Sequence, residues 1–245
     1  MASQRGVSHI VLRVPGAPIH LKPAAELAER VLLPGDPHRA LAVAQELLEG
    51  PRMFNHHRGL WGYTGRAPDG EFLTVQSTGM GGPSAAIVTE ELIALGARTL
   101  VRIGTCGALA PDLRLGELVV ADELIAADGA SRALGAEERL RPDPDLTAAL
   151  AGAARGRTGT VVSTDVFYER RPEAAVGWVA DGALAVEMEA AAIVQVASLH
   201  GARAACLLAV SDLVGAERTR IADDELESAG LRLGETAYAA TTRRP

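Results

Sequence analysis

Short apolar, strand-like stretches alternate with helix-like stretches along almost the whole chain, and this alternation constrains the fold more than any other feature. Strands are predicted at 30–33, 72–77, 99–103, 117–121, 159–163, 184–186 and 203–210, and helices at 36–48, 83–95, 189–199 and 223–239. Such alternation is typical of a largely parallel or mixed sheet with helices packed against it. We therefore predict an α/β fold, with a central mixed, mostly parallel β-sheet flanked by helices.

The predicted fold fills one domain. The chain has 245 residues, a size that single α/β domains reach, and no repeat, low-complexity segment or obvious linker divides it. We assign residues 20–245 to this domain and residues 1–19 to an N-terminal extension. Because 48% of the residues are hydrophobic but only 3% are aromatic, the core must be built mainly from Ala, Leu and Val.

Composition also limits location and partners. No apolar stretch approaches the roughly 20 residues that span a bilayer, and Arg5, His9 and Arg13 interrupt the N-terminus, which argues against a signal peptide. We expect a cytoplasmic protein with no membrane partner, in which Cys106 and Cys206 are free thiols. The net charge of −7, without a basic tail, argues against nucleic acid as the main partner.

Several unusual segments follow predicted strands. They are Pro-Gly-Asp-Pro at 34–37, Thr-Gly-Met-Gly-Gly-Pro at 78–83, Gly-Thr-Cys-Gly at 104–107 and Ser-Asp at 211–212. Ligands of open α/β sheets bind beyond the carboxyl ends of the strands. We therefore expect the functional residues to gather at these four segments.

A first candidate is the arginine inside the apolar strand 99–103. Burying Arg102 is costly unless its charge is paired. We expect the strand to run into a Gly-Thr-Cys-Gly turn, whose N–H groups, with the Thr105 hydroxyl and the Arg102 guanidinium, suit a phosphate oxyanion. A structural pair between Arg102 and a carboxylate, beside an ordinary turn, is the alternative. The turn lacks P-loop spacing, so nothing favours ATP binding.

Further cations stand near glycine-rich segments. Gly35 allows close backbone approach of an anion, Arg39 lies one turn into the following helix, and Arg58 is a third candidate. Taken singly, each arginine is more typical of a surface charge than of a ligand. The sequence pattern alone leaves both readings open.

Acidic residues stand at two other strand ends. Glu187 and Glu189 flank Met188 at a strand-to-helix junction, where a carboxylate could bind two vicinal hydroxyls or simply complement a helix dipole. Asp212 ends a buried strand, and an acid in that position can donate a proton or cap the next helix. These alternatives also stay open on the residues alone.

Read in order, the motifs resemble the nucleoside phosphorylase-I family, the group of trimeric and hexameric purine nucleoside phosphorylases and of uridine phosphorylases. The similarity is greatest to the bacterial hexameric purine enzymes. The segments that carry the resemblance are 31–39, 77–84, 102–107, 163–168, 186–190 and 210–212. It implies reversible phosphorolysis of purine ribo- and deoxyribonucleosides to free base and pentose 1-phosphate. Inorganic phosphate is then a substrate, and no cofactor or metal is needed.

The resemblance also implies a role for each candidate residue. Phosphate binding falls to Gly35, Arg39, Arg58, Arg102 and Thr105, ribose binding to His20, Met188 and Glu189, and base binding to Phe167, Glu187 and Ser211, while Asp212 is the catalytic proton donor. His20 and Arg58 would reach the site of a neighbouring subunit. Self-association, most simply a homohexamer built as a trimer of dimers, is therefore expected.

Two departures from the family pattern concern the base. Uridine phosphorylases carry a Gln-x-Arg pair soon after the Phe-Tyr motif, whereas here Glu-Arg-Arg-Pro follows Tyr168. This favours purines, although 77–83 and 127–131 also resemble uridine phosphorylases, so a uridine or broad-specificity enzyme stays the alternative. Hexameric purine enzymes place an arginine on the helix after the acid. Where that arginine would be expected, this sequence has Asp224 and Glu225. Arg218 and Arg220 are therefore the candidates to replace the arginine.

Two more distant alternatives share the fold. A nucleosidase would use water as the nucleophile, but Arg39, Arg58 and Arg102 provide an anion site that hydrolysis does not need. A non-catalytic nucleoside-binding relative would be expected to lack Glu189 or Asp212, and both are present. Phosphorolysis of purine nucleosides is the function that the sequence favours.

Overall fold

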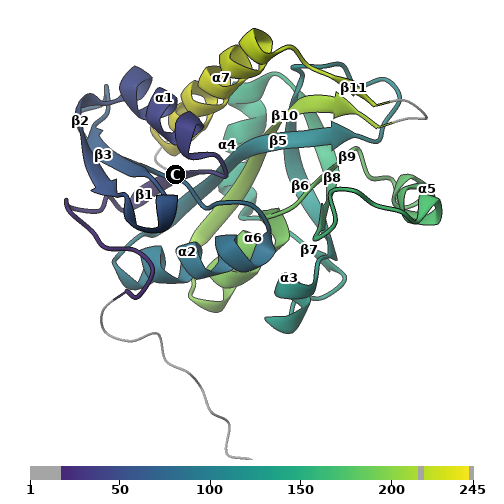
Figure 1. Ribbon diagram of the computed structural model, residues 1–245, viewed down its shortest axis with the longest axis horizontal. Helices are drawn as coiled ribbons and strands as arrows, with labels where there is room; N and C mark the ends of the chain where they lie inside the picture. The colour runs from purple at the N-terminus through teal and green to yellow at the C-terminus, as the bar shows by residue number, and fades with distance from the viewer. Residues whose placement is uncertain (1–17, 215–217, 243–245) are drawn as a thin grey trace, which may run out of the picture.

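The computed structural model describes residues 18–214 and 218–242 (Figure 1). In this part of the chain the strands are β1 Arg30–Pro34, β2 Glu49–Asn55, β3 Gly62–Arg66, β4 Phe72–Gln76, β5 Thr99–Ala108, β6 Leu118–Ala127, β7 Arg139–Leu140, β8 Arg157–Thr164, β9 Ala185–Glu187, β10 Arg203–Leu213 and β11 Thr219–Arg220. The helices are α1 Pro37–Leu47, η1 His57–Gly59, α2 Gly82–Ala94, α3 Gly129–Ala133, α4 Pro144–Ala154, α5 Pro172–Ala180, α6 Ala190–Leu199 and α7 Asp223–Thr242.

The strands form one mixed sheet that closes on itself over part of its width. Strands β4, β1, β5 and β10 pair in that order and run parallel. Strands β5, β10, β6, β8 and β9 form a ring, because β10 pairs with both β5 and β6 while β9 joins β8 to β5. More paired positions lie in parallel than in antiparallel ladders. The predicted α/β domain with a mixed, mostly parallel sheet is confirmed.

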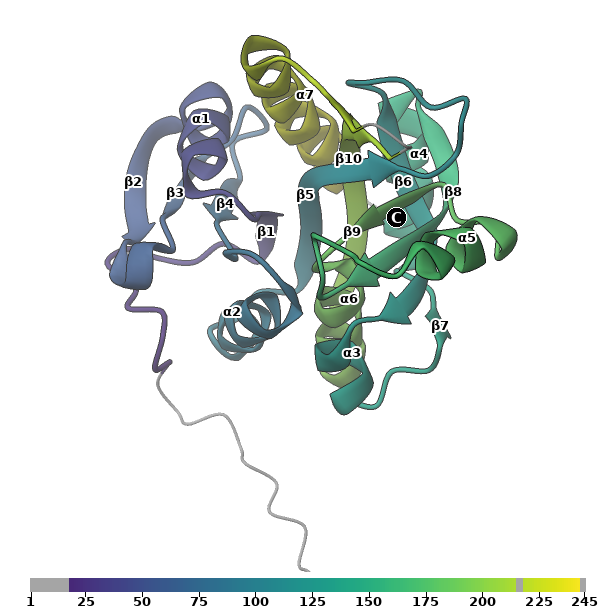
Figure 2. The same cartoon turned by 45° about the vertical axis from the view of Figure 1, so that its right-hand side comes forward.

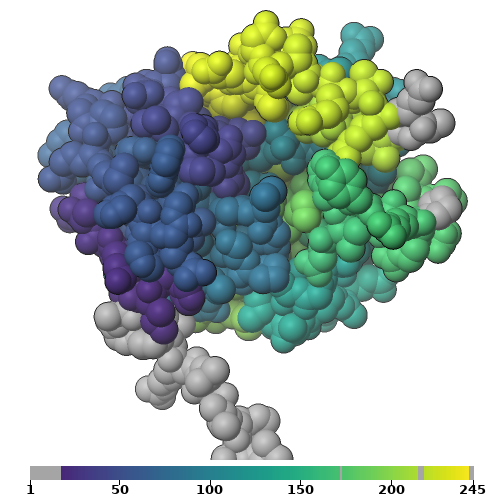
Figure 3. All heavy atoms as spheres, in the orientation of Figure 1, coloured from purple at the N-terminus to yellow at the C-terminus, as the bar shows by residue number. Residues whose placement is uncertain are grey.

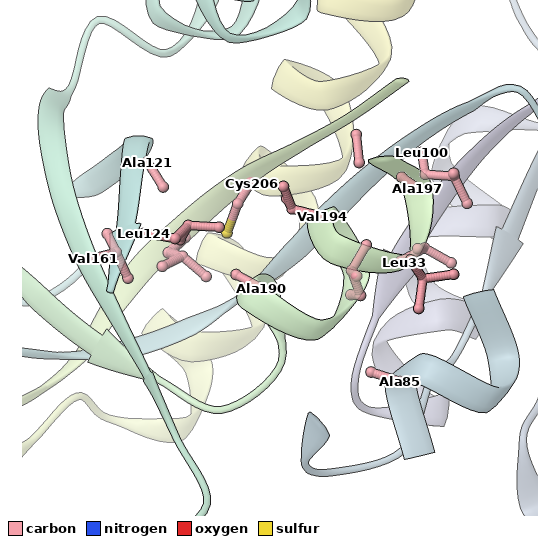
Figure 4. Close-up of a cluster of buried hydrophobic side chains, with 14 of the residues drawn as sticks. Leu33, Ala85, Leu100, Ala121, Leu124, Val161, Ala190, Val194, Ala197 and Cys206 are labelled. Atoms are coloured by element: carbon pink, nitrogen blue, oxygen red, sulfur yellow. The ribbon is translucent and has the colours of Figure 1, made fainter. Parts of the chain in front are cut away.

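Helices cover the sheet on two sides (Figure 2). Helices α1, α4 and α7 pack over one aliphatic core that includes Leu32 and Val101. Helices α2 and α6 pack over the other, which includes Leu33 and Leu100 (Figure 4). Neighbouring residues of β1 and β5 thus enter opposite cores, as side chains alternate along a strand buried on both faces. The candidate site lies along the carboxyl-terminal part of β5 and at the end of β1.

The helix starts follow their predicted signals. The Asp36 side chain accepts a hydrogen bond of 2.9 Å from the His38 N–H, so Asp36 caps α1 as expected. Helix α7 begins at Asp223 as predicted, and its acidic first turn suits the positive end of the helix dipole. In the described part of the chain, no helix is long and apolar enough to cross a membrane.

One local prediction is wrong. The Gly-Thr-Cys-Gly segment at 104–107 is not a turn, because β5 continues to Ala108 and pairs there with β10 and β9. Gly104 has a packing role instead: a Cβ built on it would lie 2.5 Å from Cζ of Arg102, whose guanidinium folds back over this position. Backbone N–H groups of a turn are therefore not available at 104–107.

Other elements were not predicted, and part of the chain is outside the described residues. The hairpin of β2 and β3 and helices α3, α4 and α5 are additions to the predicted order. Residues 1–17 of the expected N-terminal extension lie outside the described residues. The boundary at residue 20 therefore stays a prediction.

Candidate active site

A buried arginine and two buried glutamates form the centre of what we call the arginine–glutamate cluster (Arg39, Arg102, Glu187 and Glu189). The Nη2 of Arg102 donates a hydrogen bond to Glu189 Oε2, and its Nε lies 3.4 Å from Glu187 Oε2. The three side chains are only 5%, 6% and 0% exposed, in the order Arg102, Glu189 and Glu187. Burial disfavours the charged form of Arg102, but Glu189 and Glu187 outweigh it, so the pKa of Arg102 is raised. The cluster therefore holds a permanent buried cation.

Glu187 fixes the start of α6. Its Oε1 accepts from the Ala190 N–H at 2.9 Å and from the Ser163 hydroxyl, and its Oε2 accepts from the Glu189 N–H at 2.9 Å. Ser163 Oγ in turn accepts from the Ala191 N–H at 2.9 Å. Burial raises the pKa of Glu187. Because the first N–H groups of a helix lack partners within it, these contacts anchor α6 and hold Glu189 in place.

One nitrogen of Arg102 remains available to a ligand. Its Nη1 is buried and has no hydrogen-bond partner among the described residues. It faces the end of β1, since a Cβ built on Gly35 would lie 3.4 Å from Nη1 and 3.2 Å from the Gly79 carbonyl oxygen. A buried donor without a partner costs about 1–3 kcal/mol, so an acceptor bound at this point would relieve that cost.

A second cation lies near the first. Arg39 is half-buried, and burial lowers its pKa, with Arg102 lowering it further while Asp36 and Glu189 act in the opposite direction. Its side chain passes Gly230 of α7, where a Cβ would lie 3.4 Å from Arg39 Nε. Two neighbouring guanidinium groups repel each other, so an anion between them is favoured. The pairing of Arg102 with carboxylates is therefore confirmed, while its role in binding an anion stays a prediction that the unpaired Nη1 leaves open among the described residues.

The glycine-rich segment between β4 and α2 closes the other side of the cluster. The Gly81 N–H donates a hydrogen bond of 2.5 Å to Glu189 Oε1. Gly79 and Gly81 have φ angles of 72° and 87°, in the left-handed region that favours glycine. The Gly79 N–H also donates to the Gly35 carbonyl oxygen at 3.1 Å. The ends of β1 and β4 are therefore joined at the point that Arg102 faces.

A second group, the aspartate cluster (Phe167, Ser211, Asp212, Arg218 and Arg220), surrounds the end of β10. Asp212 is 6% exposed and follows a shift in register between β10 and β5, a kind of irregularity that re-aims side chains near sites. Ser211 Oγ donates to Asp212 Oδ2 at 2.7 Å, and Arg218 Nε donates to Oδ1 at 3.0 Å. Arg220 Nε lies 3.3 Å from the same Oδ1. Both arginines that the sequence left as candidates reach the acid.

Phe167 joins this cluster from the loop after β8. The Cζ of Arg218 lies 4.0 Å from the centre of the Phe167 ring, and Tyr168 packs edge-on against that ring at 5.0 Å. Phe167 is 49% exposed. On the face shown in Figure 3, the green region around α5 lies beside the yellow C-terminal region. An aromatic face, a cation and an acid thus meet at one partly open place.

His20 and Arg58 belong to a third group, which we call the histidine–arginine edge (His20, His57 and Arg58). His57 Nδ1 donates to the His20 carbonyl oxygen at 2.8 Å. Arg58 is exposed and has a φ of 60°, which costs a non-glycine residue on the order of 1–3 kcal/mol. Figures 1 and 2 agree that β2, which precedes this edge, lies on the opposite side of the molecule from α5. Within the described chain, neither His20 nor Arg58 has a hydrogen bond or ion pair with the clusters.

The remaining predicted residues lie next to the clusters without bonding to them. Thr105 is half-buried in β5, beyond Arg102, and Met188 is half-buried between the two glutamates of the cluster. Among the described residues, no three His, Cys, Asp or Glu side chains are grouped so that they could hold a metal ion. The expected absence of a metal stays a prediction.

Sequence reasoning missed three contributors to the site. Ser163 stands in a motif without a predicted role, Gly81 is predicted only as part of a glycine-rich segment, and Gly104 is placed in a turn that the structure does not have. The signal for Ser163 is a hydroxyl at the end of a buried strand, and for Gly104 a glycine two residues after a buried arginine. These two signals identify residues that surround Glu187 and Arg102, and they do not identify residues that contact a ligand.

The structure thus combines a partly closed α/β sheet with two neighbouring arginines, Arg102 inside β5 and Arg39 in α1, and with buried acids at the ends of β9 and β10. The chain belongs to the phosphorylase superfamily, whose family model matches residues 29–242. The resemblance inferred from the motifs is thereby confirmed.

Curated relatives extend over most of the chain. A protein of Geobacillus kaustophilus named purine nucleoside phosphorylase DeoD-type is 41% identical over 204 residues, which cover 79% of this chain and 86% of the relative. A protein of the same name from Roseobacter denitrificans is 37% identical over 213 residues, 84% of this chain and 91% of the relative. Another, from Clostridium perfringens, is 38% identical over 225 residues, 88% of this chain and 94% of the relative.

Proposed function

We propose that this enzyme catalyses the reversible phosphorolysis of purine ribo- and deoxyribonucleosides to the free base and pentose 1-phosphate. The observation that carries the proposal is the arrangement at Arg102, which holds Glu189 through Nη2 and whose Nη1, beside Gly35, has no partner in the described part of the chain. One guanidinium thus joins an anion position to a carboxylate suited to sugar hydroxyls. The names of the curated relatives support the same reaction.

In the proposed reaction, phosphate lies between Arg39 and Arg102, with Gly35 and Thr105 beside it. A phosphate oxygen forms the new bond to C1′ of the ribose as the C1′–N bond breaks, and the electron pair of that bond goes to the base. Glu189 uses its remaining lone pairs to accept from the ribose 2′ and 3′ hydroxyls, and Met188 packs against the sugar. The negative charge of Glu189 also stabilises the cationic character that develops on the ribose.

The base part of the reaction is assigned to the aspartate cluster. Both arginines contact Oδ1 of Asp212, so Oδ2, beside Ser211, is the oxygen that carries the proton to the leaving purine. Phe167 provides an aromatic face for the base. Arg218 replaces the arginine that the family pattern places on the following helix, and Arg220 supports it from a more exposed position.

Glu187 takes a different role from the base contact first expected. Its side chain is 0% exposed, and both oxygens already accept hydrogen bonds. We therefore assign it to positioning Glu189 and Arg102, with no direct contact to the nucleoside.

We further propose that His20 and Arg58 complete the site of a neighbouring subunit, His20 at the ribose 5′-hydroxyl and Arg58 at the phosphate. Two observations support this assignment: among the described residues neither side chain is bonded to the clusters of its own subunit, and Arg58 is exposed, so it can reach a second copy. The assembly we propose is a homohexamer built as a trimer of dimers.

We place the enzyme in the cytoplasm and propose that it needs no cofactor. Cys106 and Cys206 are both buried free thiols, a state that suits a reducing compartment. Every step of the proposed reaction is assigned to side chains of the protein and to phosphate.

The experiment that tests the proposal is release of free base from inosine, adenosine, guanosine and uridine, each with and without inorganic phosphate. Phosphate-dependent release from the purine nucleosides is the expected result. Uridine as the best substrate would instead favour the alternative, a uridine or broad-specificity phosphorylase. Release without phosphate would identify a nucleosidase, and no release would overturn the proposal.

A further inference from the structure

A single carboxylate holds the chain segment that carries His20. Glu91 of α2 is 5% exposed, and its Oε1 accepts from the N–H groups of Ile19 and His20, both at 2.9 Å. Its Oε2 accepts from the Leu21 N–H at 2.7 Å. His20 Nδ1 lies 2.8 Å from Oε1. Burial raises the pKa of Glu91, but the hydrogen bonds from Leu21 and His20 outweigh it and leave the pKa lowered.

The imidazole contact determines where the His20 proton lies. An ionised carboxylate only accepts hydrogen bonds, so Nδ1 of His20 must carry the hydrogen in a contact of 2.8 Å. In the neutral ring, Nε2 then has a free lone pair. The His20 side chain is 31% exposed, so this nitrogen is not sealed inside the subunit.

We propose that Glu91 is a positioning residue: it holds the His20 ring so that the neutral form keeps its hydrogen on Nδ1 and presents the Nε2 lone pair to the 5′-hydroxyl of the nucleoside. The proposal rests on the function proposed above, in which His20 contacts that hydroxyl. Without the carboxylate the ring would be free to rotate and to move its proton to Nε2. The 5′-hydroxyl would then face a donor in place of an acceptor for part of the time.

The same helix offers a matched comparison. Glu90, next to Glu91, also contacts a histidine, with 2.6 Å between its Oε2 and His200 Nε2. That pair is more exposed, at 24% for Glu90 and 39% for His200, and none of its hydrogen bonds reaches the segment 19–21. Glu90→Gln therefore removes a charge and a histidine contact from α2 without disturbing His20.

The test compares inosine with 5′-deoxyinosine, which lacks the hydroxyl, for the wild type, Glu91→Gln, Glu90→Gln and His20→Ala. At saturating phosphate, we expect the kcat/KM preference of the wild type for inosine to disappear in His20→Ala. In Glu91→Gln this preference for inosine should fall about tenfold, because one charge-assisted hydrogen bond is lost. The kcat/KM for 5′-deoxyinosine should change less than threefold. Glu90→Gln should behave as the wild type.

The outcomes separate the two proposals. An unchanged preference in His20→Ala would show that His20 does not contact the 5′-hydroxyl, and the ribose assignment would fail. A preference lost in His20→Ala but kept in Glu91→Gln would overturn the positioning role alone. An equal loss of activity on both substrates in Glu91→Gln would reduce Glu91 to a structural anchor.

A tautomer measurement tests Glu91 without substrate. In the wild type labelled with ¹⁵N-histidine, the His20 signals, assigned by their loss in His20→Ala, should show a protonated Nδ1 and an unprotonated Nε2 at high pH. The Nε2–H form in the wild type would overturn the proposal even if Glu91→Gln failed to fold.

Discussion

The arginine–glutamate cluster and the aspartate cluster both use β5 and its neighbours, yet they are held in different ways. In the first, the three central side chains are 6% exposed or less, and helix N–H groups and a serine hydroxyl secure Glu187. In the second, Asp212 is buried, but Arg218 and Arg220 are 35% and 66% exposed. In the proposed reaction, phosphate and the pentose, which all substrates share, would meet the more buried cluster, which we call the rigid part. The base, which varies, would meet the more exposed cluster, which we call the adjustable part.

The largest effect is expected from Arg102→Ala, which tests whether the arginine–glutamate cluster is held rigidly. The change leaves Glu187 and Glu189 buried without their cation, and removing one partner of a buried pair costs about 3–5 kcal/mol. We expect a fall of that size in the free energy of unfolding, measured by urea denaturation, together with loss of phosphorolysis. Arg98→Ala, at an exposed position just before β5, should shift stability by less than about 0.5 kcal/mol. A similarly small shift for Arg102→Ala would contradict the rigid character of the cluster.

Asp212→Asn tests the adjustable part. We expect kcat to fall by about 10²–10⁴, the range for loss of a general acid, with little change in KM. The measurement is steady-state phosphorolysis of inosine and guanosine. Asp224→Asn, an exposed acid in the first turn of α7, serves as the control and should keep full turnover. Unchanged turnover in Asp212→Asn would remove this residue as the proton donor.

Ser163→Ala examines the support of the rigid part. The change leaves the Ala191 N–H and one acceptor position of Glu187 without the hydroxyl that joins them. We expect the free energy of unfolding to fall by about 1–3 kcal/mol. The KM values for the nucleoside and for phosphate should rise, and kcat should change less. Thr158→Ala, exposed on the same strand, is the matched control. If the KM values for the nucleoside and for phosphate stay at the wild-type level, α6 does not depend on Ser163 for its position.

The smallest effects are expected at the two arginines around Asp212. Arg218→Ala removes a part-exposed ion pair and the contact with Phe167, so kcat/KM for purine nucleosides should fall about three- to tenfold, with less than about 1 kcal/mol lost in stability. Arg220→Ala should change less, because its contact is longer and more exposed. Initial rates with adenosine and inosine measure both. A larger effect for Arg220→Ala would reverse the assignment of the two residues.

The sequence was informative where a residue's chemistry conflicts with its surroundings. An arginine in an apolar strand predicts a paired or ligand-binding cation, and Arg102 is both paired and left with one donor. Asp36 before a helix predicts a cap, and it forms one. The alternation of strands and helices was sufficient to predict the α/β sheet, although not that five strands of it close into a ring.

What sequence alone could not give depends on contacts between distant segments. Both oxygens of Glu187 accept hydrogen bonds, from N–H groups at the start of α6 and from Ser163 on the neighbouring strand β8, and spacing along the sequence does not reveal these contacts. Which arginine reaches Asp212 depends on the path of the chain between β10 and α7, and spacing along the sequence does not determine that path. The turn predicted at 104–107 was wrong because glycine there makes room for a side chain and does not bend the backbone.

The anchoring of α6 by Glu187 links assembly of the site to the folding pathway. The same carboxylate secures the first turn of the helix and places Glu189, so the helix and the proposed ribose contact should become ordered together. A refolding chain in which α6 has not yet docked would have no sugar-binding carboxylate, however complete its sheet. Recovery of activity during refolding would thus report on the docking of one helix, with a time course that lags behind formation of the strands.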